Sequence, residues 1–450
     1  MAFHDAPQNG RGPRRVGAWH TQGVTPRRLL PFLLSICALA AVTPSAGAKP
    51  VGGVQSVSVG SAMSPKEATT TLDHAKAVNA KLIRVSAVWS SLEPKQGQQN
   101  LTYLAAIDRL VDGASARGIR TLLLVVGTPC WASSAPAKNC SAANANESAA
   151  TRYPPADPAD FVKISTFLAA RYGTKLAAFE VWNEPDQSNQ LYWAGPDKIK
   201  RYVALAQAAY APLKAANPQM TVLAGAFVGG DGRWLQALYD AGIKGSYDAL
   251  SVHFYDLPLE ALRQTRAVET HNGDKAPLWL AETGFSSCYK HGRKDAAKDH
   301  VCLTRAGQAQ ALTDLFAATR STSWLKATIV YTLQDESTAY QFGLWDNQGK
   351  RKPAATAVHK AFTNKKVRAT KPSVRLTTRR GSVTIRARGS WVEVYSITAK
   401  VDGVLRYRAA ARTDRFGAIT ITLPSSIGTR HVKVTVLGRW THKKAVRSTS

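Results

Sequence analysis

Several features that mark common protein classes are missing from this sequence of 450 residues. No glycine-rich phosphate loop follows the first strand-like segment, which argues against a nucleotide-binding sheet. No residues have the spacing of metal ligands and no cofactor motif is present, so we expect neither a metal nor a cofactor. Apart from one apolar run near the N-terminus, no segment approaches the length that spans a bilayer. The sequence therefore predicts neither a nucleotide-dependent enzyme nor a metalloenzyme nor an integral membrane protein.

The apolar run near the N-terminus has the character of an export signal. Five arginines precede residues 29–42, and the small residues Ala46-Gly47-Ala48 follow as a signal peptidase requires. A membrane anchor is the alternative, but about 14 apolar residues with Pro31 among them are too few to cross a bilayer. We therefore expect residues 1–48 to be a signal peptide, the protein to be secreted, and no transmembrane anchor to remain.

Cysteines are also scarce, with five in the chain. Cys37 lies inside the expected signal peptide, and the remaining four allow three connectivities. Loop closure favours the two local pairs, Cys130 with Cys140 and Cys288 with Cys302, each stabilising the fold by about 2–3 kcal/mol. A zinc site is the alternative, but it would need closer cysteine spacing. The sequence predicts two disulfides, which suit an exported protein.

Acidic residues are few: 30 aspartates and glutamates stand against 59 lysines and arginines, for a net charge of +29. Much of the excess lies in residues 365–450, which hold 20 basic and three acidic side chains. Such a region favours an anionic polysaccharide, a cell-wall surface or lipid headgroups, although a solvated strand surface explains the charge equally well. No recognition motif for nucleic acid appears, and export removes the usual target, so we expect no nucleic-acid partner.

Short β-branched runs alternate with longer amphipathic stretches, as in repeated βα units. Proline recurs in the first turn of expected helices, at Pro65, Pro158 and Pro196. Eight such units with carboxylates after the fourth and seventh strands favour a closed ring over an open sheet. The predicted fold is α/β, a (β/α)8 TIM barrel in residues 49–364. The expected strands are residues 55–59, 82–87, 120–126, 177–182, 221–226, 249–254, 278–281 and 327–332. The expected helices are residues 65–80, 101–117, 158–171, 196–216, 233–241, 259–271, 304–320 and 354–362.

The pattern changes after Lys365-Lys366, where apolar and polar residues alternate with period two between turn residues such as Asp402-Gly403. A run of about 80 such residues predicts a small antiparallel β-sandwich. We expect this basic β-sandwich domain in residues 365–450, after a linker at residues 364–372. The expected strand segments are residues 373–388, 391–400, 404–412, 418–423 and 431–437.

Two glutamates each end a strand-like apolar run. Glu184 stands in Asn183-Glu184-Pro185 after the fourth expected strand, and Glu282 follows the seventh. The end of a buried strand is where barrel enzymes keep their chemistry. Cleavage of a glycosidic bond requires at least two carboxyl groups, one as proton donor and one as nucleophile or base. The pair therefore predicts a glycosidase.

The strand-end residues resemble those of glycoside hydrolase clan A, the retaining barrel glycosidases. They are most similar to family 39, with family 5 next, and the resemblance covers about residues 52–364. Besides both glutamates it rests on segments after other strands: Ile83-Arg84-Val85, Gly127-Thr128-Pro129-Cys130-Trp131, His253-Phe254-Tyr255 and Phe342-Gly343-Leu344-Trp345-Asp346.

The resemblance and the chemistry of hydrolysis together imply a role for each residue. Glu184 is expected to be the acid/base and Glu282 the nucleophile, with carboxyl groups about 5–5.5 Å apart, against about 6.5–9.5 Å in an inverting site. Arg84 is expected to keep Glu282 ionised, with a barrel-core ion pair as the alternative. Asn183 is expected to hydrogen-bond the sugar 2-hydroxyl. Glu180 is interpreted as a core acid or a support for the site.

The remaining candidates contact substrate or orient the site. Tyr255 is expected to donate to the nucleophile and His253 to orient the site, with strand-end packing as the alternative for both. Trp131, Tyr331 and Trp345 are expected to stack on sugar faces, with core packing as their alternative. The eighth strand ends in Tyr331-Thr332, without the tryptophan often found there in relatives, so the identity of the sugar stays open.

The sequence predicts a secreted, monomeric, retaining β-glycosidase that hydrolyses O-glycosidic bonds of a polysaccharide or oligosaccharide through a covalent glycosyl-enzyme. An endo-acting glycanase is favoured over an exo-acting xylosidase-like enzyme. A non-catalytic carbohydrate-binding or cell-wall-binding protein that kept the barrel is one alternative. A transglycosylase that uses the same residues is the other.

Overall fold

The computed structural model of the chain describes residues 49–56, 63–140, 149–228, 232–290, 300–363 and 367–450. The expected signal peptide, residues 1–48, lies outside the described residues, as does the start of the expected linker at residues 364–366. Among the helices of the described residues, none combines the length and the apolar character needed to cross a membrane.

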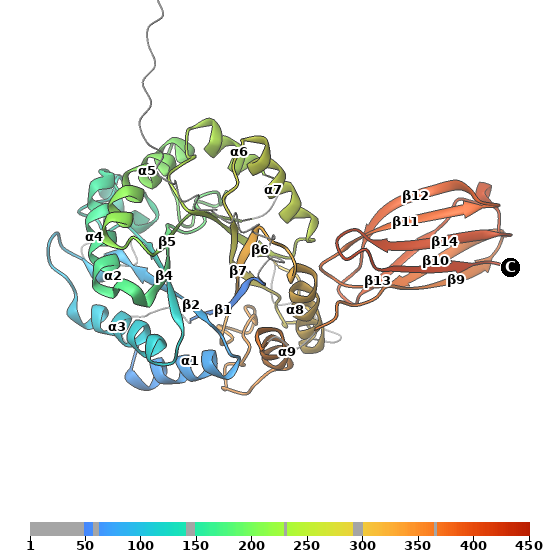
Figure 1. The fold of residues 1–450 in the computed structure, drawn as a ribbon, viewed down its shortest axis with the longest axis horizontal. Coiled ribbons are helices and arrows are strands. Elements are labelled where there is room, and N and C mark those ends of the chain that lie inside the picture. The colour runs from blue at the N-terminus through green and yellow to red at the C-terminus, as the bar shows by residue number, and fades with distance from the viewer. Residues whose placement is uncertain (1–48, 57–62, 141–148, 229–231, 291–299, 364–366) are drawn as a thin grey trace, which may run out of the picture. The chain divides into compact units, whose positions relative to one another are not determined.

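Parallel strands β1 to β8 form a closed barrel in sequence order, in which β8 pairs with β1. Figure 1 shows these strands in the middle of a ring of helices. The predicted (β/α)8 TIM barrel is therefore confirmed. The strands are β1 (Val51–Gln55), β2 (Leu82–Val88), β3 (Arg120–Val126), β4 (Leu176–Val181), β5 (Thr221–Val228), β6 (Ala249–Tyr255), β7 (Leu278–Gly284) and β8 (Leu325–Val330).

Four of the helices around the barrel, α1, α3, α4 and α8, begin after a residue whose side chain caps them. Ser64 forms a capping box with Glu67 at the start of α1. Pro65 and Pro158 occupy first turns as predicted, but α5 begins after Asp197, so the prediction that Pro196 starts a helix is wrong. The α-helices are α1 (Pro65–Ala77), α2 (Trp89–Leu92), α3 (Leu101–Ala116), α4 (Pro158–Tyr172), α5 (Lys198–Ala216), α6 (Arg233–Asp240), α7 (Glu260–His271), α8 (Arg305–Thr319) and α9 (Pro353–Phe362). Short 3-10 turns are η1 (Ala137–Asn139), η2 (Ala149–Arg152), η3 (Gly173–Lys175) and η4 (Ser425–Ile427).

The first strand begins earlier than predicted, because β1 covers Val51–Gln55, whereas the expected segment was residues 55–59. Residues 57–59 of that segment lie outside the described residues. Glycines at positions 52 and 53 leave this segment with few β-branched residues, so its composition does not indicate a strand. A Cβ atom on Gly52 would lie 2.3 Å from the Phe362 ring of α9. Only glycine lets this helix approach the strand so closely. The close packing therefore requires a glycine in β1, and the glycine makes the strand hard to recognise from the amino-acid composition of the segment.

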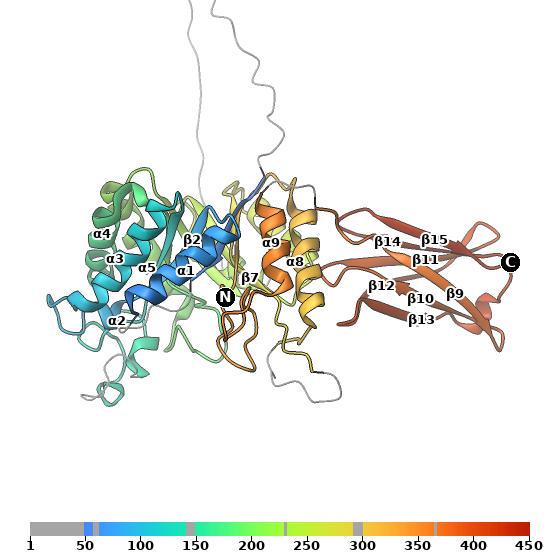
Figure 2. The same ribbon diagram turned by 90° about the horizontal axis from the view of Figure 1, so that it is seen from below.

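Two antiparallel sheets follow the barrel, with strand orders β13-β10-β9 and β12-β11-β14-β15. Apolar side chains of both sheets, such as Ile385 and Ile397, form one buried cluster. The sheets therefore pack face to face as the predicted sandwich, and Figure 2 shows their strands running alongside one another. Strand β15 was not predicted, since most of its residues are exposed. The strands are β9 (Ser373–Arg379), β10 (Ser382–Arg388), β11 (Val394–Val401), β12 (Val404–Arg412), β13 (Ala418–Thr422), β14 (Val432–Gly438) and β15 (Lys444–Ser448).

Candidate active site

Strand β4 leads into a sharp turn that presents Glu184. Beyond this fully buried strand, Trp182 (φ 69°) and Glu184 (φ 41°) have left-handed backbone conformations, which cost a non-glycine residue about 1–3 kcal/mol each. The backbone N–H of Glu184 donates to the carbonyl of Ala226 at 2.9 Å. The indole N–H of Trp182 donates to the carbonyl of Tyr192 at 2.7 Å. These contacts hold the turn and offset its strain.

The carboxylates of Glu184 and Glu282 come together at the ends of β4 and β7. One oxygen of each and a ring nitrogen of His253 all lie within 4.8 Å of one another. His253 Nδ1 is 2.7 Å from Glu184 Oε1 and 3.6 Å from Glu282 Oε2. Both glutamates are nearly buried, at 7% and 8% exposed. The upper bound of 4.8 Å between the nearest oxygens fits the close carboxyl groups of a retaining site, about 5–5.5 Å apart, better than the wider pair of an inverting site.

Arg84 of β2 joins four polar side chains. Its Nε donates to Glu180 Oε2 at 2.6 Å and its Nη2 to Asn183 Oδ1 at 2.9 Å. Its Nη1 donates to Gln55 Oε1 at 2.9 Å and to Glu282 Oε1. Burial would lower the pKa of Arg84, but the charges of Glu180 and Glu282 raise it above its ordinary value. Both roles considered for Arg84, a core ion pair and a contact with Glu282, are therefore present in one side chain.

Glu180 is a third carboxylate beneath the first two, and it is completely buried. It accepts hydrogen bonds from Arg84 and from the hydroxyl of Ser251. His253 Nε2 lies 3.8 Å from Glu180 Oε1, which is an ion-pair distance but too long for a hydrogen bond. Burial would raise the pKa of Glu180, but the charge of Arg84, with His253 and Ser251, lowers it to about 2. Glu180 is thus an anion at any working pH.

His253 carries a positive charge in this setting. Burial would lower its pKa, but the charge of Glu282 and the attraction of Glu180 and Glu184 raise the pKa to about 10. The imidazolium therefore persists through neutral pH and donates its Nδ1–H to Glu184. Together with Arg84 it supplies two cations against three carboxylates.

Tyr255, at the end of β6, donates its hydroxyl to Glu282 Oε2 at 2.7 Å. Burial and the charge of Glu282 raise the pKa of Tyr255 well above its ordinary value, so the hydroxyl stays protonated. Its ring meets those of Tyr331 and Phe342 edge to face, at 5.9 and 5.6 Å. A Cβ atom on Gly284 would lie 2.4 Å from the carbonyl of Tyr331, so glycine allows the segments after β7 and β8 to approach.

The two candidate tryptophans make their contacts elsewhere. Trp345 is 5% exposed and stacks on His74 of α1 with 4.0 Å between ring centroids. Trp131 meets Trp89 edge to face at 5.6 Å and donates its indole N–H to the carbonyl of Glu93. The structure does not bring either tryptophan into the cluster around the two glutamates, and their contacts are those of core packing. Sugar stacking by these two residues stays a prediction.

The segment between β4 and α5 adds groups that sequence reasoning missed. The amide of Gln187 donates to Glu184 Oε2. Burial, with the charges of Glu184 and Glu282, raises the pKa of Tyr192. Burial and the charge of Glu184 also raise the pKa of Asp186 to about 6. No strand alternation or helical period marks this segment, so nothing in the sequence could have found these residues.

Among the residues that the structure describes, two groups have the spacing that a metal ion requires. In one, Glu184, His253 and Glu282 surround a common point, but a protonated imidazole is no metal ligand. In the other, His300 lies beside Cys288 and Cys302, but these cysteines are bonded to each other. Neither group therefore suits a metal.

Both predicted disulfides are present. Cys130–Cys140 follows β3 and Cys288–Cys302 follows β7, with Cα atoms 5.6 and 4.7 Å apart. Each closes a short loop at the end of the barrel that carries the glutamates. The covalent links restrict the segments that surround the catalytic cluster.

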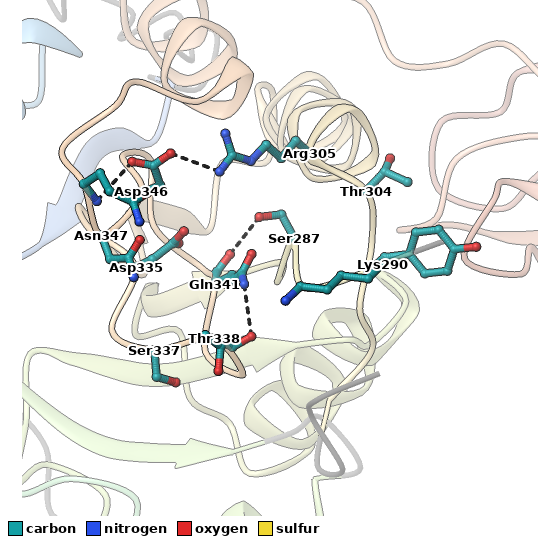
Figure 3. A pocket seen from close by; sticks show the side chains of 12 residues that line it. Ser287, Lys290, Thr304, Arg305, Asp335, Ser337, Thr338, Gln341, Asp346 and Asn347 are labelled. Atoms are coloured by element: carbon teal, nitrogen blue, oxygen red, sulfur yellow. Dashed lines mark hydrogen bonds and ion pairs between the residues drawn. The ribbon is translucent and has the colours of Figure 1, made fainter. Parts of the chain in front are cut away.

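A polar cavity of about 460 Å³ lies between the segments that follow β7 and β8. Figure 3 shows the Lys290 side chain reaching toward Gln341, while Arg305 pairs with Asp346 at 3.0 Å. Hydroxyl and amide groups make up much of the remaining lining, including Ser287, Ser337, Thr338 and Asn347. The two glutamates, His253 and Tyr255 are not among the residues that line this cavity.

The comparisons agree with this site. The model of the cellulase family (glycosyl hydrolase family 5) matches residues 45–308, which is more than half of the chain. No curated relative matches the sequence. The solved structures that are similar include a family 39 glycoside hydrolase from Bacteroides cellulosilyticus WH2, at 16% identity and TM-score 0.52, over 87% of this chain and 81% of that one.

Two further structures extend the likeness to family 39. A family 39 enzyme from Xanthomonas axonopodis pv. citri has 15% identity and TM-score 0.52, over 84% of this chain and 93% of that one. A monomeric β-xylosidase from Caulobacter crescentus CB15 has 14% identity and TM-score 0.52, over 84% and 95%. Identities this low show the fold alone. The predicted clan is confirmed by the family model: the chain belongs to the cellulase family, glycosyl hydrolase family 5, and is a retaining glycoside hydrolase of clan A.

Proposed function

We propose that this glycoside hydrolase is a secreted β-glycosidase that cleaves a polysaccharide or oligosaccharide through a glycosyl-enzyme formed on Glu282. The observation that carries the proposal is the pair of carboxylates, Glu184 and Glu282, with oxygens within 4.8 Å of each other. Glu282 receives hydrogen bonds from Arg84 and Tyr255, one on each oxygen. These two fixed donors hold the carboxylate for attack on the anomeric carbon.

Glu184 supplies the proton. The imidazolium of His253 donates its Nδ1–H to Glu184 Oε1, and we propose that this proton moves along the bond to Glu184 once the substrate is bound. As the bond to the leaving oxygen breaks, Glu184 gives up the proton and Glu282 bonds to the anomeric carbon. Glu184 then removes a proton from water, the water oxygen bonds to the anomeric carbon, and Glu282 leaves as a carboxylate.

Asn183 is placed to recognise the sugar ring. Its Oδ1 accepts from Arg84, which fixes the orientation of the amide and leaves the N–H₂ group to donate to a substrate hydroxyl. We propose that this group donates to the hydroxyl on the carbon next to the reacting centre. Tyr331, beside Tyr255, offers an aromatic edge to the same sugar.

The substrate is proposed to be a chain of sugars. The polar cavity between the segments that follow β7 and β8 has hydroxyl, amide and lysine groups in its lining, which suit hydrogen bonds to a further sugar unit. This supports action on a polymer or a longer oligosaccharide rather than on a single glycoside.

Secretion rests on the N-terminal signal and agrees with the two disulfides, which persist in oxidising surroundings. Sequencing the N-terminus of protein recovered from culture medium tests it. We expect the mature chain to start at Lys49, and a product that remains inside the cells with Met1 in place would contradict secretion.

Screening aryl β-glycosides and soluble polysaccharides tests the activity, and two variants test the roles. Glu184→Ala should still cleave aryl glycosides with good leaving groups, and added azide should give a β-glycosyl azide. Glu282→Ala should give the α-azide instead, because azide then replaces the nucleophile. Binding of carbohydrate without turnover of any substrate by the native protein would overturn the proposal.

A further inference from the structure

The outer face of the three-stranded sheet has an unusual composition. Side chains alternate along each strand, so that Val383, Ile385 and Ala387 of β10 point into the sandwich core and their neighbours point outward. The outward side chains are arginines and small hydroxyl residues, apart from one alanine. We name them the arginine face: Ser373, Arg375, Thr377, Arg379, Ser382, Thr384, Arg386, Arg388, Ala418, Thr420 and Thr422.

Like charges face each other directly on this surface. Arg375 of β9 lies opposite Arg386 of β10, and Arg388 follows on the same side of β10. Like charges directly opposite in an antiparallel pair destabilise a sheet. Within the described residues, no acidic side chain pairs with any of these arginines. The two facing arginines therefore destabilise the sheet unless an anion from outside the chain binds to them.

The acids of the basic region are engaged elsewhere. Glu393 is buried and accepts hydrogen bonds from the backbone of Trp440 and Thr441. Asp414 accepts from the backbone of Phe416. Asp402 lies in the turn between β11 and β12, on the other sheet. None of the three is placed to neutralise the arginine face.

The side chains of the arginine face favour a ligand that carries both carboxylates and hydroxyl groups. Guanidinium groups bind carboxylates through two parallel hydrogen bonds, and the interleaved hydroxyls of Thr377, Thr384 and Thr420 match the hydroxyls of sugars. Strands lie about 4.8 Å apart and same-face residues about 6.8 Å apart along a strand. The charges thus form a dense flat array, which suits an extended polymer laid across it.

Other polyanions fit the face less well. The face has no aromatic ring on which a nucleic-acid base could stack. It also has no large apolar side chain to enter a bilayer. We propose that the arginine face binds an acidic polysaccharide built of uronate sugars, by pairing its arginines with the carboxylates of the polymer. This goes beyond the glycosidase activity and assigns one face and one ligand class to the excess charge of residues 365–450.

The four-stranded sheet offers a matched comparison. Lys400 of β11 lies opposite Lys433 of β14, so this sheet also sets two cations against each other. Its strands, however, expose the apolar side chains of Val404 and Val446. Lysine is a point charge without the planar fork of arginine. If net charge alone attracted the polymer, the two pairs would contribute equally.

The experiment compares two double variants of the full chain. Arg375→Thr with Arg386→Thr removes the arginine pair, and Lys400→Thr with Lys433→Thr removes the same charge from the other sheet. Threonine is a good strand former at all four positions. Alginate serves as the acidic polysaccharide and a neutral glucan as its control, with affinity measured at physiological ionic strength. Thermal unfolding and hydrolysis of an aryl β-glycoside show that both variants are folded and active.

We expect the arginine variant to bind alginate about tenfold more weakly than the native protein, as two lost ion pairs imply, and the lysine variant to change by less than about twofold. Three results would overturn the proposal. They are absence of alginate binding by the native protein, equal losses in both variants, and preferential binding of DNA or phosphatidylglycerol vesicles by the same arginines. Since hydrolysis is measured separately, failure here leaves the proposed glycosidase function standing.

Discussion

His253 and Glu184 share a hydrogen bond of 2.7 Å between Nδ1 and Oε1, although His253 lies in β6 and Glu184 follows β4. His253 is also 3.6 Å from Glu282. One buried cation thus lies between the two carboxylates that the mechanism requires in different protonation states. The arrangement keeps a proton at the bond between His253 and Glu184, where the leaving oxygen needs it, while Glu282 remains an unprotonated nucleophile.

The charge of His253 predicts a pH-dependent contribution to stability. Its pKa is raised from the ordinary 6.5 to about 10, so the native state holds a proton that the unfolded state releases between these values. The stabilisation is fully present below about pH 6.5 and is lost as the pH rises toward 10, by up to about 1.4 kcal/mol per pH unit. Chemical denaturation of the native protein and of His253→Gln across this range measures it. A stability difference that stays constant from pH 6 to 10 would contradict the assignment.

Glu180 is predicted to be a positioning residue. In Glu180→Gln, Arg84 and His253 lose the anion between them, so kcat should fall by about 10- to 100-fold with little change in KM. The free energy of unfolding should drop by about 3–5 kcal/mol, because a buried cation loses its partner.

A matched control exists outside the barrel centre. Asp108 pairs with Arg171 at 2.7 Å where both are partly exposed, so Asp108→Asn should cost less than about 1 kcal/mol and leave kcat unchanged. Equal effects of the two variants on kcat would show that Glu180 acts on stability alone.

Tyr255→Phe removes one of the two donors to Glu282 but keeps the ring contacts with Tyr331 and Phe342. A hydrogen bond to a charged group contributes about 1.5–3 kcal/mol, so kcat/KM should fall by roughly 10- to 100-fold. Tyr239→Phe is the control, because Tyr239 donates to Asp274, which precedes β7, whereas Glu282 lies near the other end of that strand. Native kinetics in Tyr255→Phe would remove Tyr255 from the mechanism.

The disulfide after β7 is predicted to stabilise the fold. Replacing Cys288 and Cys302 by serine opens a loop of 14 residues, which should lower the free energy of unfolding by about 2–3 kcal/mol. Denaturation of the variant and of the native protein, with and without reductant, measures this loss. Identical curves for the oxidised native protein and the variant would contradict it.

Much of the fold could be predicted because its signals are local. The barrel strands are buried on both faces and read as apolar runs, and residues such as Ser64 and Pro65 mark helix starts. Strand β1 was misplaced because Gly52 is there for close packing against Phe362, a tertiary requirement with no local signature. The exposed strand β15 lacks the apolar alternation that reveals its neighbours.

The residues of the site likewise divide into those that the sequence could predict and those that it could not. Glu184, Glu282 and Arg84 were found because they end or lie within recognisable strands, and the structure brings them together. Gln187 was missed because its amide reaches Glu184 from an irregular segment. Trp345 follows the eighth strand as expected, but its ring packs on His74, and only the three-dimensional path of the chain decides where a side chain after a strand points.

The most direct test of the account is to identify the residue that carries the sugar during turnover. A fluorosugar inhibitor that forms the glycosyl-enzyme quickly and releases it slowly should label the protein once. Digestion and mass spectrometry should then find the sugar on the peptide that contains Glu282, with no label in Glu282→Ala. A label on another carboxylate, or no label together with a product of inverted configuration, would contradict the mechanism.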